Sequence, residues 1–164
     1  FLKSYCQAIK ETGVQGVIIA EPAAGLISND DCIRYSSFYV QQIVEAVQDE
    51  DFIVILHNCG NAGHCTDAMV KSGAKGLHFG NKIDMVSALN NTPKNILAMG
   101  NIDPVGIFKQ ATVQEVYDTS LELLNKTSGK NNFILSSGCD VPPGTPFENI
   151  KAFYQALTNY NASK

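Results

Sequence analysis

Five short apolar runs alternate with helical segments along this chain, and the alternation restricts what the chain can fold into. The strongest run, FIVIL at residues 52–56, is continuous, as is typical of a strand buried on both faces of a parallel sheet. We predict strands at residues 14–20, 53–57, 76–79, 96–100 and 133–137. We predict helices at residues 5–11, from Asp30 or Asp31 (as cap) to about Gln48, and at 67–72, 85–89, 113–126 and 147–157. This strict order indicates an α/β fold with right-handed crossovers.

Two architectures satisfy this order, an open doubly wound sheet and a (β/α)₈ barrel. No G-x-G-x-x-G sequence follows any strand, so the dinucleotide-binding fingerprint is missing. Polar side chains instead follow nearly every strand, which is the barrel pattern: they are Glu21, His57 with Cys59, His78, Asn101 with Asp103, and Cys139 with Asp140. A complete barrel has eight strands and ~250 residues. We therefore predict a single domain, residues 1–164, that forms about five βα units from the C-terminal portion of a TIM (β/α)₈ barrel and lacks its N-terminal strands.

Composition limits the classes of function. Apolar residues make up 45% and charged residues 17% of the chain, which is typical of a globular protein. The net charge of −4 and the lack of a basic run argue against nucleic acid as a partner, and no apolar run approaches the ~20 residues of a membrane span. Five scattered cysteines do not resemble a disulfide framework and favour the cytoplasm. The open sheet edges of a partial barrel would favour a homodimer.

The motif HNCGN directly after residues 52–56 suggests a metal site. Alternate residues of an extended chain point the same way, so His57 and Cys59 present an imidazole and a thiol to one point. These soft ligands suit Zn²⁺. The alternative is a hydrogen-bonded histidine and a buried cysteine without metal. A closed four-ligand site that adds His64 and Cys65 is less consistent, because the spacing is not a usual zinc spacing and these residues open the next helix.

Three motifs in order resemble the uroporphyrinogen decarboxylase superfamily: HNCGN at residues 57–61, GNIDP at 100–104 and SSGCDVPPGTPFENIKAF at 136–153. The decarboxylase branch has a glycine–histidine–glycine sequence where this chain has Gly138, Cys139 and Asp140. The methylcobalamin:coenzyme M methyltransferase-like branch binds zinc through a histidine–x–cysteine pair and a distant cysteine. His57, Cys59 and Cys139 match that pattern.

This resemblance implies a zinc-dependent methyltransferase. It would move a methyl group from a methylated corrinoid, either a corrinoid protein or free methylcobalamin, to a small thiol such as coenzyme M. Two alternatives stay open: a metal-free decarboxylase of the uroporphyrinogen type, and a non-catalytic fragment.

We also expect functional roles for four other residues at or after strand ends. We expect Glu21 to act as a displaceable zinc ligand or as a base for the thiol, against the alternative of a carboxylate paired with a cation. His78 is predicted to contact substrate or corrinoid, against the alternative of a hydrogen-bonded loop histidine. Asn101 is expected to shape the pocket floor for the cofactor. Asp140 is expected to orient a ligand or to cap the proline-rich loop.

Several motifs predict local structure alone. Asp103 before Pro104 is typical of a turn start. Asp84 is predicted to cap the helix that starts at residue 85. The sequence TPFE at 145–148 is typical of a capping box with Pro146 in the first helical position.

Overall fold

The computed structural model describes residues 1–60 and 63–163, and it contains one parallel sheet of five strands in the order β1-β2-β3-β4-β5. The strands are β1 (Gly16–Ala20), β2 (Ile53–Asn58), β3 (Gly76–Phe79), β4 (Leu97–Ile102) and β5 (Phe133–Ser137). The predicted parallel strands are confirmed, and β3 and β5 have the predicted bounds. Asn61 of the HNCGN motif lies outside the described residues.

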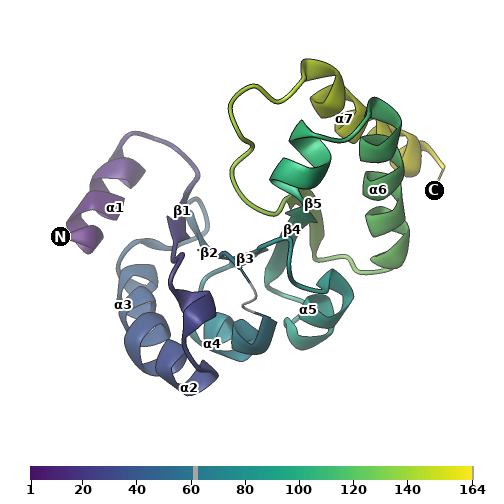
Figure 1. Cartoon of the computed structure of the whole chain (residues 1–164). Helices are drawn as coiled ribbons and strands as arrows, with labels where there is room; N and C mark the ends of the chain where they lie inside the picture. Colours follow the sequence, from purple (N-terminus) through teal and green to yellow (C-terminus); the bar gives the residue numbers. More distant parts are fainter. Residues whose placement is uncertain (61–62, 164) are drawn as a thin grey trace.

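Helical segments connect successive strands and follow the last one. The α-helices are α1 (Leu2–Glu11), α2 (Asn29–Cys32), α3 (Phe38–Val47), α4 (Thr66–Lys71), α5 (Met85–Asn91), α6 (Val113–Lys126) and α7 (Phe147–Ala162). Short 3₁₀ turns lie at η1 (Ala24–Leu26) and η3 (Gly63–Cys65), and π-helical turns at η2 (Ile33–Ser37) and η4 (Pro104–Lys109). Figure 1 shows the helices in an arc around the curved sheet, with the two termini at opposite ends.

The two faces of the sheet differ sharply in burial. Val54, Leu56 and Leu77 are 0% exposed and belong to the main core, together with buried residues of α3, α4 and α5. On the edge strands β1 and β5, side chains that point to the opposite face are exposed to solvent: Ile18 is 57% exposed and Ile134 is 38% exposed. In the described residues, the outer face of the sheet is therefore covered by helices while its concave face is open. This arrangement is that of part of a barrel wall.

Side-chain caps fix the starts of α2, α5 and α6, and the starts of α2 and α7 differ from the prediction. Ser28, rather than Asp30 or Asp31, caps α2, because its Oγ accepts the backbone N–H of Asp31 at 3.1 Å. The predicted capping box at residues 145–148 is wrong. Pro146 takes the cap position with ψ 136° and no side-chain cap bond, and the hydroxyl of Thr145 donates to the carbonyl of Pro142 at 2.8 Å instead.

A capping box does occur at α6, and two predicted local roles are confirmed. Thr112 and Glu115 exchange the two reciprocal bonds of the box. Asp84 caps α5 by accepting the N–H of Ser87 at 3.0 Å. Asp103 accepts the N–H groups of Val105 and Gly106, each at 2.9 Å, and so begins the turn η4 as predicted. The sequence does not predict that this turn is π-helical.

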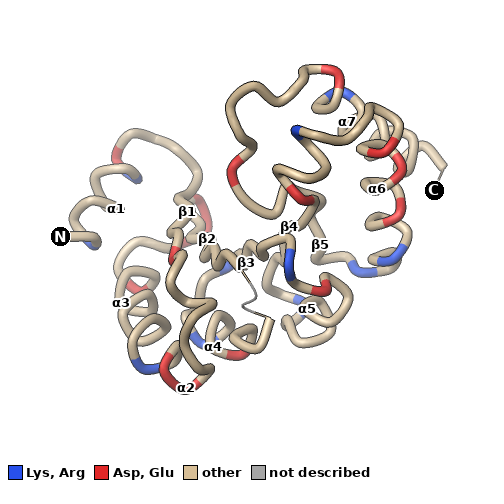
Figure 2. Tube along the Cα trace, viewed as in Figure 1, with Lys and Arg blue, Asp and Glu red and all other residues tan. Residues whose placement is uncertain are grey.

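Charged side chains are scattered over the molecule. Figure 2 shows Lys and Arg distributed among helices and loops rather than gathered on one surface. No helix in the described part of the chain combines the length and apolar character needed to cross a membrane.

We predict that truncating a core leucine will destabilise the fold much more than truncating an exposed leucine. Leu56→Ala should lower the free energy of unfolding by about 2–5 kcal/mol, since Leu56 is 0% exposed and its loss leaves a cavity. The matched change Leu26→Ala, at a residue that is 86% exposed, should change it by less than about 0.5 kcal/mol. Urea unfolding of both variants measures this, and equal losses would contradict the assignment of the core.

Candidate functional site

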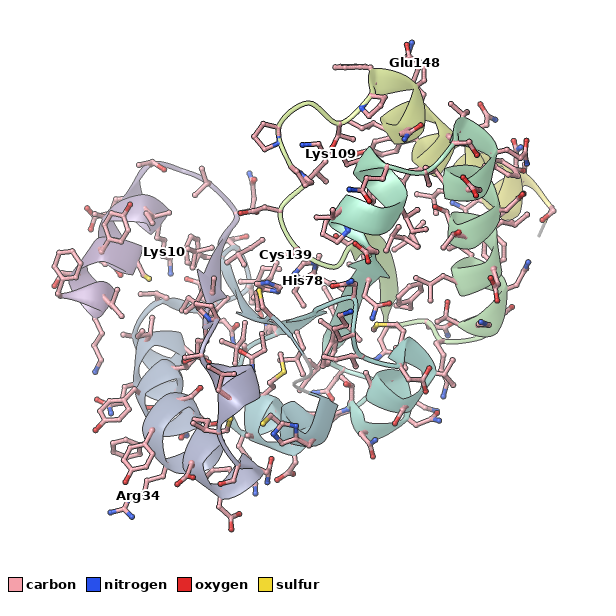
Figure 3. The ribbon with its side chains drawn as sticks, in the orientation of Figure 1. Lys10, Arg34, His78, Lys109, Cys139 and Glu148 are labelled. Carbon is pink, nitrogen blue, oxygen red and sulfur yellow. The ribbon has the colours of Figure 1, made fainter. Side chains whose placement is uncertain are left out.

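Three metal-ligand side chains converge at the carboxyl ends of the strands. The possible ligand atoms of His57, Cys59 and Cys139 all lie within 4.8 Å of one another. His57 Nε2 is 2.7 Å from Cys59 Sγ and 3.6 Å from Cys139 Sγ, and the two sulfur atoms are 3.4 Å apart. Figure 3 shows Cys139 beside His78 at the centre of the molecule, between β2 and the loop after β5. The described residues contain no second cluster of this kind.

Curvature of the sheet makes this convergence possible. Cys59 follows β2 and Cys139 follows β5, and two strands lie between them. Three strand spacings of ~4.8 Å would hold the two chains roughly 14 Å apart in a flat sheet. The sulfur atoms are nevertheless 3.4 Å apart. The two cysteines meet because the sheet is bent and the loop after β5 returns across its mouth.

The glycine before Cys139 allows a close approach that helps to place the loop. A Cβ at Gly138 would lie 2.5 Å from the backbone nitrogen of Asn81, closer than real atoms approach. The N–H of Gly138 also donates to the carbonyl of Ile102 at 2.7 Å, which prolongs the ladder between β4 and β5. Cys139 therefore leaves the sheet from a position where only glycine fits between two loops.

The three side chains have the donor set and nearly the spacing of a zinc site. Tetrahedral zinc with Zn–N of about 2.0 Å and Zn–S of about 2.3 Å separates two sulfurs by about 3.8 Å, and a sulfur from a nitrogen by about 3.5 Å. The sulfur pair at 3.4 Å and the Cys139–His57 pair at 3.6 Å are close to these values. The 2.7 Å contact of Cys59 with His57 is a thiol–imidazole hydrogen bond, and it would have to lengthen on metal binding. One His and two Cys also leave a fourth position for a substrate.

Burial in the site disfavours the charged forms of Cys59 and His57. Burial raises the pKa of Cys59 to about 11, helped by its hydrogen bond to Cys139 and by the charges of Cys139 and Asp140. Burial lowers the pKa of His57, although its bond to the His78 carbonyl and the charge of Asp140 oppose the shift. A neutral imidazole is ready to bind a metal, whereas a thiol must lose its proton to do so.

His78 lies against the ligand His57 rather than in the open part of the site. Its Nδ1 is 2.7 Å from Nδ1 of His57, and the two ring centres are 4.6 Å apart. Its Nε2 donates to the carbonyl of Ser137 at 2.8 Å and lies 3.3 Å from the hydroxyl of Ser136. Burial lowers the pKa of His78, as does the charge of His57. The predicted direct contact with substrate or corrinoid stays a prediction.

Glu21 follows β1, next to the strand that carries His57. Its backbone N–H donates to the carbonyl of His57 at 2.9 Å, and its carboxylate accepts the hydroxyl of Ser36 at 2.5 Å. Burial raises the pKa of Glu21, while the bond from Ser36 opposes the shift. The carboxylate does not belong to the cluster of three ligands among the described residues. Its role as a zinc ligand or base therefore remains a prediction.

Asn101 and Asp140 lie at the rim of the site. The amide of Asn101 donates to the carbonyls of Gly80 and Ile83, at 3.0 and 2.7 Å, and so secures the loop that Gly138 contacts. Asp140 is exposed and acts on His57, His78 and Cys59 through its charge. Cofactor binding by either residue stays a prediction.

His64 and Cys65, the other two residues of the four-ligand alternative, lie apart from the cluster of His57, Cys59 and Cys139. Cys65 is buried with its sulfur 3.1 Å from that of Cys32, and burial with Cys65 as neighbour raises the pKa of Cys32 to about 12. His64 is exposed, with its Nε2 3.0 Å from the carbonyl oxygen of Ile27. Neither His64 nor Cys65 joins the cluster of His57, so the four-ligand alternative is excluded for the described structure.

Two supporting residues of the site, Ser137 and Gly138, were not predicted from the sequence. Ser137 acts through its backbone carbonyl, which any residue carries, so its side chain gave no signal. Gly138 stood inside the SSGCD motif, where a glycine just before a candidate ligand could have indicated a close approach of two backbones.

The chain belongs to the uroporphyrinogen decarboxylase (URO-D) family, which it matches over residues 1–160. It is 30% identical to the methylcobamide:CoM methyltransferase MtbA of Methanosarcina acetivorans over 162 residues, which is 98% of this chain and 46% of that protein. It is also 30% identical to a uroporphyrinogen decarboxylase of Prochlorococcus marinus, covering 98% of this chain and 45% of that protein.

A solved structure confirms the fold. A methyltransferase from Methanosarcina mazei superimposes with a TM-score of 0.85 and 25% identity, covering 96% of this chain and 46% of that one. The chain thus spans about half the length of the relatives it matches, and the predicted partial barrel is confirmed.

We predict that the chain binds one zinc ion through its three converging ligands. Cys139→Ser should weaken zinc binding by more than ~100-fold, because changes outside the ligand set alone already cost about 10–100-fold. Cys6→Ser is the matched control, since Cys6 is buried on α1 in the main core, apart from the ligand cluster. Zinc titration against a competing chelator measures both variants. Zinc retained by Cys139→Ser, or lost equally in both, would contradict the site.

Proposed function

We propose that this chain is the metal-binding part of a zinc-dependent methyltransferase, which moves a methyl group from a methylated corrinoid to a small thiol such as coenzyme M. The observation that supports this most directly is the convergence of His57, Cys59 and Cys139 on one point. The 30% identity to a methylcobamide:CoM methyltransferase supports the same function. The corrinoid donor is either a corrinoid protein or free methylcobalamin.

The chemistry follows from the donor set. A zinc ion supplies Lewis acidity that keeps a bound thiol deprotonated at neutral pH. His57, Cys59 and Cys139 would hold the ion, and three protein ligands would leave a position for the substrate thiol. The reaction forms a sulfur–carbon bond to the methyl group and breaks its cobalt–carbon bond, with the electron pair remaining on cobalt.

Glu21 is the proposed proton acceptor or displaceable ligand. Glu21 directly follows Ala20, the register partner of His57, and burial raises the pKa of its carboxyl group. A raised pKa makes a carboxylate a better base. Asn101 and Asp140 are proposed to contact the bound substrates at the rim, where Asp140 is exposed.

A metal-free decarboxylase of the uroporphyrinogen type is the second candidate, supported by a decarboxylase relative of the same 30% identity. Against it stands Cys139, whose thiol takes the place of the histidine expected from that branch. A non-catalytic fragment is the third candidate. The chain spans about half of the length of its relatives. We therefore propose the complete pocket for the methyl donor, and full activity, only for a barrel that includes the other half.

We also propose a cytoplasmic location and association with a further polypeptide surface. The described cysteines are all free thiols, which favours a reducing compartment. The open edges and concave face of the sheet favour pairing, either as a homodimer or with the rest of a barrel.

Thiol binding gives a test of the proposed function that does not depend on turnover. In the chain loaded with Co²⁺ in place of zinc, adding coenzyme M should increase the thiolate-to-cobalt absorption, because the acceptor sulfur enters the free position. The matched compound 2-hydroxyethanesulfonate, which carries a hydroxyl in place of the thiol, should cause no change. An equal response to both compounds, or no response to coenzyme M, would exclude thiol activation.

Turnover should be weak in this chain alone. Loss of the methylcobalamin absorption with added thiol should be far slower than for a full-length methyltransferase, and absent in Cys139→Ser. Full activity of the 164-residue chain would contradict the proposal that the rest of the pocket comes from elsewhere. Decarboxylation of uroporphyrinogen, unaffected by Cys139→Ser, would support the second candidate instead.

A further inference from the structure

His78 joins the two ligand-bearing segments of the candidate site. It lies on β3, which pairs with β2 so that His57 and His78 are direct neighbours in the register. Its ring reaches His57 on one side and the carbonyl of Ser137 on the other, and Ser137 lies two residues before Cys139. Only 8% of His78 is exposed, so its two nitrogen atoms depend on these partners.

The hydrogen-bond partners fix the proton on each ring nitrogen. A carbonyl oxygen only accepts hydrogen bonds, so His78 Nε2 must carry the hydrogen that it donates to Ser137 at 2.8 Å. In a neutral ring the other nitrogen is then bare, so His78 Nδ1 is an acceptor. It lies 2.7 Å from His57 Nδ1, and of these two nitrogens the one on His57 must therefore carry the hydrogen.

A second contact supports the same assignment for His57. Its Nδ1 is also 3.2 Å from the backbone carbonyl of His78, which is a further acceptor. With the hydrogen on Nδ1, the Nε2 of His57 is bare. That nitrogen faces Cys59 and Cys139, at 2.7 and 3.6 Å from their sulfur atoms.

We propose that His78 is a positioning residue that holds His57 in the tautomer with hydrogen on Nδ1, so that Nε2 is free to bind the metal. The hydrogen bonds run from the Ser137 carbonyl through His78 to His57. They connect the strand before Cys139 to the strand that carries His57. Groups that hold the second nitrogen of a histidine ligand raise its affinity for metal. The metal part of this inference rests on the proposed function, whereas the tautomer does not.

Two amide variants and one aromatic variant of His78 separate positioning from packing. His78→Asn places an amide oxygen near the former Nδ1 and retains the acceptor for His57. His78→Gln extends its amide towards the former Nε2 and retains the contact with Ser137 instead. His78→Phe keeps the ring shape and removes both partners. If His78 acts only by filling space, His78→Phe is the mildest change and His78→Asn is among the more severe.

The tautomer is measured by long-range ¹⁵N–¹H NMR of the imidazoles in the reduced, metal-free chain. The sequence has three histidines, so His64 gives a reference signal in every spectrum. We expect the Nδ1–H form for His57 in the parent and in His78→Asn, and a shift towards the Nε2–H form in His78→Phe and His78→Gln. An Nε2–H form in the parent would overturn the inference.

Zinc titration of the same proteins gives the second measurement. We expect His78→Phe and His78→Gln to bind zinc about 10–100-fold more weakly than the parent, and His78→Asn to recover most of the affinity. Equal weakening in all three, or His78→Phe as the mildest, would overturn the positioning role. A parent chain that binds no zinc but shows the Nδ1–H form would refute the proposed function and leave the tautomer assignment intact.

Discussion

The bend of a parallel sheet is the constraint on which the candidate site depends. Strands β2 and β5 are separated by two other strands. In a flat sheet, their ends would be too far apart for side chains from both to reach one metal ion. The bend brings the loop after β5 over the mouth, and the bare backbone at Gly138 lets that loop touch the segment after β3. Asn101 secures the same segment through two carbonyls, so strand ends that are distant in sequence share one rigid rim.

Burial disfavours charge on the two histidines and on Cys59 in the candidate site. The two buried imidazoles cannot both be cationic at contact distance without a large cost, and burial lowers the pKa of each. The thiol of Cys59 keeps its proton for the same reason. Asp140 is the nearby anion. Because it is exposed, solvent screens its electrostatic effect on these groups. Binding of a cation by thiol groups would release protons from them.

Sequence predicted most of the fold because the apolar pattern was unambiguous. The strand at residues 133–137 and the helix at 113–126 were predicted with the bounds that the structure has, since each ends at a clear polar or glycine signal. The π-helical turns were not predictable, because their bonding pattern has no simple residue period. The cap at residues 145–148 was misassigned because Pro146 took the position before the helix, which moved Thr145 out of reach.

The candidate site was predicted less evenly than the fold. His57 and Cys59 followed from alternation along a strand, but nothing local could place Cys139 beside them, and it was found through resemblance to a family. His78 was recognised as a strand-end residue, yet its contact with His57 depends on the register between β2 and β3. Register is a property of two segments together, and a single segment does not encode it.

The three candidate ligands lie between His57 and Cys139, within one contiguous stretch that covers about half of the related methyltransferase structure. In the proposed zinc site, all three donors come from one arc of the sheet, so the opposite arc could change without moving them. Relatives that share this arc could then differ in their reaction through side chains on the other arc. The coexistence of methyl-transfer and decarboxylating relatives around one sequence is what such modularity would produce.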